Sequence, residues 1–96
     1  MGKVISIRLS NSSKEDVEFV LEPWGEVYKM PPETVFEVVG RGPDGDTIEV
    51  ETAPGKLVVY GWPGSILELY SGGSQLGVEF GQRPPAPGPV ALPKKS

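Results

Sequence analysis

Apolar residues in this chain recur at every second position, and the alternation persists along most of the sequence. Ile5, Ile7 and Leu9 alternate with polar residues near the start, and Phe36 and Val38 do the same further along. A period of two places alternate side chains on opposite faces of a β-strand, whereas a helix needs apolar residues three or four positions apart. The pattern therefore predicts an all-β chain.

Turn residues divide the alternating segments at short intervals. The dividing stretches are rich in proline, glycine or small polar residues, at positions 11–14, 23–25, 31–33, 40–45, 53–55, 61–64 and 71–74. Seven to eight short strands spaced in this way are typical of a small antiparallel β-sandwich, immunoglobulin-like or of a related Greek-key type, with a small barrel as the alternative. We interpret 40–45 as a hairpin loop, and we expect Ile48 and Val50 to point inward.

The end of the chain has a different composition. Residues 82–96 contain five of the eleven prolines and no aromatic residue. Proline-rich segments act as extended spacers or as binding segments. We therefore expect a β-sandwich domain at residues 1–81, followed by a proline-rich tail at 82–96. In the tail, Pro84, Pro85 and Pro87 are the residues that we expect to make a contact.

Charge is distributed unevenly within the net charge of −4. Residues 1–81 hold all thirteen acidic residues and six of the nine basic ones. An acidic body repels phosphate backbones, so we expect no nucleic-acid partner. No apolar run approaches the roughly 20 residues that span a bilayer, and the N-terminus lacks the apolar segment of a signal peptide. We therefore expect no membrane partner and a cytoplasmic location.

The chain contains neither cysteine nor histidine. Disulfides, thiolate metal sites and thiol nucleophiles are excluded, and the commonest general base is missing. A pair of carboxylates can still hydrolyse glycosides, but most glutamates fall at outward strand positions. Asp44 and Asp46 flank a turn that lacks the six to eight oxygen ligands of calcium. We expect no metal, no cofactor and no catalysis. A small carboxylate-dependent hydrolase is the least favoured alternative.

Both tryptophans lie in turns framed by proline and glycine, at Pro23-Trp24-Gly25 and at Gly61-Trp62-Pro63-Gly64. Such turns lie at the surface. Exposed rings there can form a recognition surface, whereas buried rings would close one end of a sandwich. The sequence leaves both interpretations open. The binding residues that we expect are Trp24, Tyr28, Tyr60, Trp62 and Tyr70.

These features predict a small, acidic, non-catalytic module for protein binding or assembly. Its partner is expected to be another protein or a second copy of the chain. A carbohydrate-binding module that uses the same aromatic residues is the alternative. We expect the proline-rich tail to dock against Trp24, Trp62 and Tyr28, in its own molecule or in a neighbour.

Overall fold

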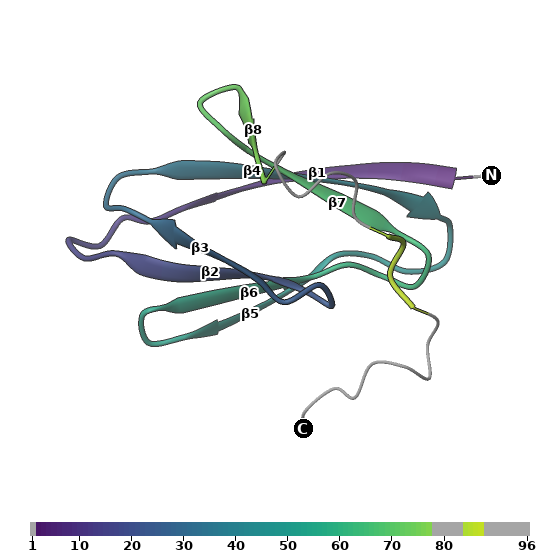
Figure 1. The fold of residues 1–96 in the computed structure, drawn as a ribbon, viewed down its shortest axis with the longest axis horizontal. Coiled ribbons are helices and arrows are strands. Elements are labelled where there is room, and N and C mark those ends of the chain that lie inside the picture. The colour runs from purple at the N-terminus through teal and green to yellow at the C-terminus, as the bar shows by residue number, and fades with distance from the viewer. Residues whose placement is uncertain (1, 78–83, 88–96) are drawn as a thin grey trace.

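The computed structural model of the chain describes residues 2–77 and 84–87 (Figure 1). These residues form two four-stranded sheets. The first sheet has the order β1 (Gly2–Ser10), β4 (Val35–Pro43), β7 (Ile66–Ser71) and β8 (Ser74–Leu76). The second has the order β3 (Glu26–Met30), β2 (Val17–Glu22), β6 (Lys56–Tyr60) and β5 (Glu49–Ala53). The predicted all-β sandwich is confirmed.

The two sheets lie face to face (Figure 1). No described strand of one sheet pairs with a strand of the other, so the closed barrel, our alternative, is wrong. Neighbouring strands are antiparallel except β2 and β6, which pair in parallel at the centre of the second sheet. The expected boundary between residues 81 and 82 lies outside the described residues. In the part of the chain that the structure describes, no helix has the length and apolarity to cross a membrane.

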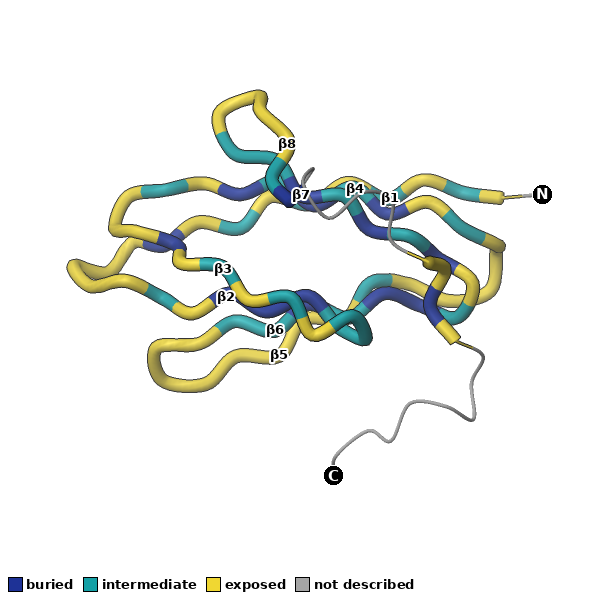
Figure 2. Tube along the Cα trace, viewed as in Figure 1, coloured by how far each residue is buried: buried dark blue, intermediate teal, exposed yellow. Residues whose placement is uncertain are grey.

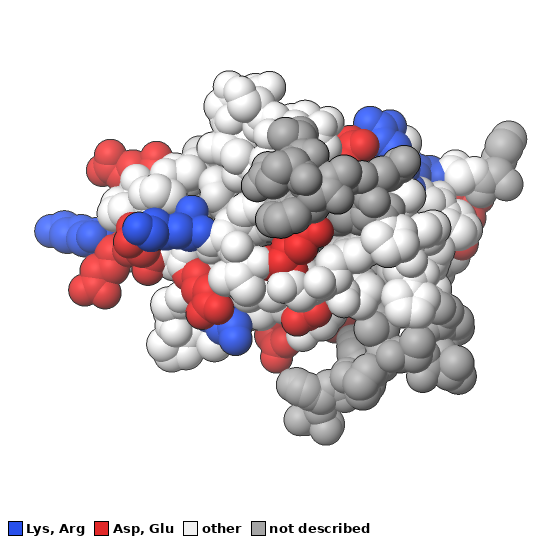
Figure 3. Space-filling view, viewed as in Figure 1, with Lys and Arg blue, Asp and Glu red and all other residues white. Residues whose placement is uncertain are grey.

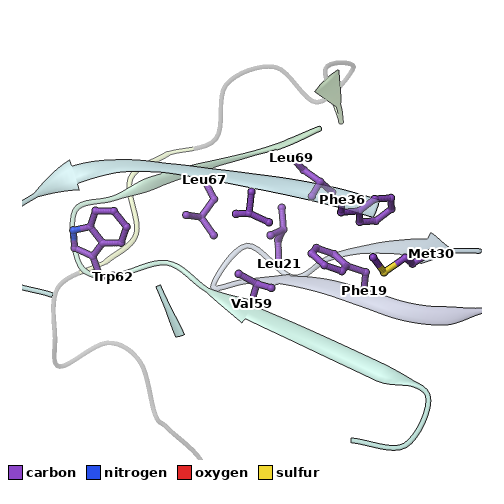
Figure 4. Packing of buried hydrophobic residues seen from close by; sticks show 9 residues of the cluster. Phe19, Leu21, Met30, Phe36, Val59, Trp62, Leu67 and Leu69 are labelled. Carbon is purple, nitrogen blue, oxygen red and sulfur yellow. The ribbon is translucent and has the colours of Figure 1, made fainter. Parts of the chain in front are cut away.

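Burial is concentrated between the sheets (Figure 2). The core cluster consists of Phe19, Leu21, Met30, Phe36, Val38, Val59, Trp62, Leu67 and Leu69 (Figure 4). Phe19 of β2 meets Phe36 of β4 with ring centroids 5.0 Å apart and planes at 76°. This edge-to-face pair suits the charge distribution of aromatic rings. The two sheets therefore share one continuous core.

The predicted hairpin at residues 40–45 is wrong. β4 continues through Gly40 and Gly42, and the chain then crosses to β5 in the other sheet. A Cβ atom on Gly40 would lie 2.8 Å from Cζ3 of Trp62, and one on Gly42 would lie 2.7 Å from Cα of Ser65. Real Cβ atoms do not approach other atoms so closely. Glycine is needed at both positions because other parts of the chain touch this strand.

β5 is more exposed than its alternation predicts. Ile48 is half-buried and packs against the core, but Val50 is 39% exposed. All five residues of β5 are exposed, because β5 lies at the edge of the second sheet and pairs only with β6 among the described strands. Alternation identifies the strand without giving its place in the sheet.

A buried polar side chain closes one end of the sandwich. Asn11 is 4% exposed. Its amide nitrogen donates to the carbonyl oxygens of Glu15 at 2.7 Å and Met30 at 2.9 Å, and its Oδ1 accepts from the Ser13 N–H at 2.9 Å. Its backbone carbonyl accepts from the N–H of Glu33 at 2.8 Å. Asn11 thus ties the β1–β2 connection to the β3–β4 connection.

Candidate functional site

Trp62 closes the opposite end of the sandwich, in the connection from β6 to β7. It is 2% exposed, and its Nε1 donates to the carbonyl oxygen of Pro43 at 2.7 Å. The ring lies over Gly40, and Nζ of Lys3 lies 5.6 Å from the ring centroid. That separation suits a cation–π contact. A ring enclosed in this way presents no face to a ligand, and Trp62 belongs to the core (Figure 4).

Trp24 lies at the same end, in the turn between β2 and β3, and is half-buried. The N–H of Gly25, which has a φ of 70°, donates to the carbonyl oxygen of Leu21 at 2.9 Å and closes this turn. The indole ring reaches Gly61, where a Cβ atom would lie 3.1 Å from Cη2 of Trp24. Nε1 of Trp24 donates to the carbonyl oxygen of Pro84 at 2.7 Å. Trp24 therefore connects the sandwich to the proline-rich segment.

Residues 84–87 run beside the β6–β7 connection and pair with it as a short strand would (Figure 1). The N–H of Ala86 donates to the carbonyl oxygen of Ser65 at 2.8 Å, and the carbonyl oxygen of Ala86 accepts from the N–H of Gly64 at 2.9 Å. The Ala86 side chain is 5% exposed, whereas the three prolines of the segment are exposed. We call the surface formed by Trp24, Gly64 and Ser65 the indole notch.

Ser65 fixes the indole notch to the core. Its side chain is fully buried. A Cβ atom on Gly61 would lie 2.6 Å from Oγ of Ser65, and one on Gly42 would lie 2.9 Å from its Cβ. Oγ of Ser65 has no hydrogen-bond partner among the described residues. A side chain larger than serine has no room between these two glycines.

The three tyrosines that we expected in the site lie elsewhere. Tyr28 is on the inner face of β3, Tyr60 on the outer face of the second sheet and Tyr70 on the outer face of the first. Their hydroxyl groups donate to Glu26 at 2.6 Å, Glu51 at 2.9 Å and Glu68 at 3.0 Å, in that order. The five aromatic residues therefore do not form one surface, because the register places them on different faces.

Neighbouring glutamates raise the pKa of two of these tyrosines. The hydrogen bond to Glu51 raises the pKa of Tyr60 above its ordinary 10.0, and desolvation adds to the shift. The hydrogen bond to Glu68 likewise raises the pKa of Tyr70 above 10.0. A tyrosine hydroxyl is already protonated at neutral pH, and the raised pKa keeps it protonated further into the alkaline range. Both groups therefore act as neutral hydrogen-bond donors.

The three residues that form the indole notch carry no charge. On the face shown in Figure 3, charged side chains are densest at the end with the β1–β2 and β3–β4 connections, opposite the notch. Within residues 2–77 and 84–87, no group of three or more potential ligands converges to hold a metal ion. The notch itself offers one indole donor and backbone groups. This chemistry suits an uncharged polypeptide segment.

Comparisons of this chain with protein-family models, with curated proteins and with solved structures found no match. Its function is therefore inferred from the geometry of the site. That geometry includes Gly64, Ser65 and Ala86, which sequence reasoning missed. The signal that points to Ala86 is its place between prolines, because it carries the one backbone N–H of residues 84–87.

Proposed function

We propose that the protein is a non-catalytic protein-binding module, and that the indole notch binds an extended proline-rich segment. The docking of residues 84–87 carries this proposal, because they occupy the notch through three hydrogen bonds. Aromatic donors and backbone hydrogen bonds are the groups by which proteins recognise extended peptides. The contact surface thus already has an occupant of the proposed chemistry.

The one backbone N–H of residues 84–87 finds an acceptor in the notch. Proline has no N–H, so Pro84, Pro85 and Pro87 leave no donor to be satisfied. The N–H of Ala86 is the remaining donor of residues 84–87, and it is bonded to Ser65. A segment of this kind can leave water without leaving a backbone donor unpaired, and its prolines restrict the free chain, which reduces the entropy cost of binding.

The burial of Ala86 supplies selectivity. Its side chain is 5% exposed, beside the fully buried Ser65. A larger or charged residue at this place would have to displace core atoms or lose its hydration. We therefore expect the notch to prefer alanine or a residue of similar size between two prolines.

The two alternatives have less support. Sugar binding needs exposed rings along one face, whereas Trp62 is buried and the tyrosines lie on other surfaces. Hydrolysis by carboxylates needs acidic residues at the site, and the notch is formed by Trp24, Gly64 and Ser65. The peptide-binding proposal accounts for the observed contacts.

We extend the proposal to an immunoglobulin-like architecture. Two sheets packed face to face support it, although the parallel β2–β6 pair departs from the antiparallel sheets of immunoglobulin domains. The cytoplasmic location stays a prediction.

The test is binding in trans by the full chain. The Ala86→Asp substitution places a charge at a buried site and should release residues 84–87 from the notch. A synthetic peptide with the sequence of residues 82–89 is then titrated while tryptophan fluorescence is followed. The variant should bind at least about tenfold more tightly than the wild type, since a tethered competitor acts at an effective concentration on the order of millimolar.

Pro85→Asp is the matched control, because it adds the same charge to an exposed position of the same segment. This variant should bind the peptide as weakly as the wild type. A peptide that itself carries aspartate in place of Ala86 should not bind. If the folded Ala86→Asp variant shows no binding of the unaltered peptide, the proposal is wrong.

A further inference from the structure

β1 is an unusually long edge strand. It spans nine residues, Gly2–Ser10, and β4 is its partner among the described strands. Strands in globular proteins are most often about 5–6 residues long. Its register with β4 runs without a break from Gly2 opposite Pro43 to Ser10 opposite Val35. Along an edge strand, alternate backbone N–H and C=O groups point away from the sheet, so β1 offers a straight row of them.

The usual protection of edge strands is weak in β1. It contains no proline, and its continuous register leaves no bulge. Lys3 and Arg8 are its two charged residues, and charge on an edge strand opposes pairing. Lys3, however, lies near one end of the strand, with its Nζ over the ring of Trp62 at 5.6 Å. By contrast, β8 at the other edge of the same sheet has three residues. The edge strands of the second sheet, β3 and β5, have five residues each. β1 is therefore the longest edge among the described strands and offers the most backbone groups to another strand.

The side chains of β1 are incompletely covered. Ile5, Ile7 and Leu9 point toward the core but are only half-buried, whereas Val38 on β4 and Leu69 on β7 are fully buried. On the outer face, Val4 is 60% exposed. A further strand beside β1 would cover part of this apolar area, and that burial favours association.

We infer that β1 pairs antiparallel with β1 of a second copy of this chain, about a two-fold axis at Ser6. In this register Ile5 lies opposite Ile7 of the second copy, and Val4 lies opposite its Arg8. Lys3 lies opposite Leu9, so no like charges face each other. The pairing joins two four-stranded sheets into one continuous sheet, which is the self-complementary contact of a two-fold dimer.

The sequence of β1 favours this register over its neighbours. If one β1 strand were shifted by one residue relative to the other, the inward side chains of one copy would lie opposite the outward side chains of the other. Only shifts by an even number of residues keep both cores on the same side of the sheet. A shift by two residues in either direction leaves the ends of β1 without a partner, whereas the register centred on Ser6 pairs all nine residues.

Cysteine cross-linking tests both the dimer and its register, because the chain has no cysteine of its own. In an antiparallel pair, opposite Cα atoms are about 4.5–5.5 Å apart, which suits a disulfide. Full-length Ser6→Cys should therefore form a disulfide-linked dimer under mild oxidation. Ser10→Cys, on the same strand and face, is the matched control, because its counterpart would lie about 27 Å away.

Sedimentation equilibrium gives a second readout. The wild-type chain should dimerise as its concentration approaches the order of 1 mM, which corresponds to about 4 kcal/mol of association free energy. The charge variants are made in a Glu37→Gln background, because Glu37 accepts from the Ser6 hydroxyl at 2.8 Å and would neutralise a lysine at position 6. In that background Ser6→Lys should weaken the dimer several-fold, because two lysines would meet at the axis. Mixing it with Ser6→Glu in the same background should restore a mixed dimer.

Three outcomes would overturn the inference. They are a chain that stays monomeric at these concentrations, a Ser6→Cys variant that cross-links no faster than Ser10→Cys, and mixed Ser6 variants that fail to associate. None of these measurements depends on the indole notch, so the proposed function is tested separately.

Discussion

Trp62 lies directly against Gly40, so that a Cβ atom on Gly40 would be 2.8 Å from Cζ3 of the indole and 2.9 Å from Cδ2 of Leu67. The glycine belongs to β4 in the first sheet, and the indole is in the connection between the sheets. Their contact explains why a strand interior contains a residue that ordinarily weakens strands. The buried tryptophan holds the two sheets together at the end that carries the indole notch.

Gly40→Ala should lower the free energy of unfolding by about 1–3 kcal/mol, because the added methyl group overpacks the core. Combining it with Trp62→Phe, which removes the distal ring atoms, should give a loss smaller than the sum of the two single losses. Urea denaturation of the four proteins in the cycle measures this coupling. Additive losses would show that the two residues do not share one packing site.

The two tryptophans should respond differently to substitution. Trp62→Phe should lower the free energy of unfolding by about 2–3 kcal/mol, because it leaves a cavity and removes the bond to Pro43. Trp24→Phe should cost about 1 kcal/mol, since the ring is half-buried and one hydrogen bond is lost. Each variant retains one tryptophan, and acrylamide should quench Trp24 more readily than Trp62. Equal quenching would contradict the burial described above.

Asn11→Ala should destabilise the chain by about 2 kcal/mol, because it leaves the buried carbonyl of Met30 without a hydrogen bond and removes the bonds to Ser13 and Glu15. Thermal or urea unfolding measures the change. Ser12→Ala, at the exposed neighbouring position, is the control and should change stability by less than about 0.5 kcal/mol. A small effect of Asn11→Ala would mean that water replaces the lost bonds at this end of the sandwich.

Stability should decrease at alkaline pH. The pKa values of Tyr60 and Tyr70 are raised above 10.0, so the folded chain holds these protons more tightly than the unfolded chain does. Their contribution to the free energy of unfolding is fully present below pH 10, and it is lost as the pH rises through the raised pKa values of the folded chain. Unfolding measured across this range should show the loss.

Glu51→Gln should lower the pKa of Tyr60, because it removes the charge of the carboxylate to which Tyr60 is hydrogen-bonded. Phenolate absorbance during an alkaline titration measures this change. Glu68→Gln is the matched variant and should act on Tyr70 instead. An unchanged titration in both variants would mean that the glutamates do not control these groups.

Much of the architecture could be predicted from the sequence, because alternation depends on local periodicity. Ile5 and Ile7 share one face of β1, and Phe36 and Val38 share one face of β4, as the alternation predicts; in the structure both faces point to the core. The tertiary neighbours of a residue are not local. In the sequence Gly40 is typical of a turn, and only the structure shows that it is a strand residue in contact with Trp62.

The same limit applies to the candidate site. Trp24 and Trp62 could be identified as residues of one end of the sandwich, but their different burial depends on strand order and on the proline-rich segment. Proximity along the chain groups Tyr60 and Tyr70 with them, whereas the register places these tyrosines on opposite outer faces of the sandwich. A contact of the tail with Trp24 is expected from the sequence, but no local pattern indicates that Ala86 pairs with Gly64 and Ser65, about twenty positions earlier.

The most direct measurement of the central claim is the indole N–H signal of Trp24 in a ¹H–¹⁵N spectrum of the full chain. Trp62, bonded to Pro43 within the core, provides an internal reference. In the Ala86→Asp variant, the Trp24 signal should shift and its N–H should exchange faster, while the Trp62 signal and the Pro85→Asp control stay unchanged. If the Trp24 signal is the same in all three proteins, residues 84–87 do not occupy the indole notch, and the proposed function loses the observation that carries it.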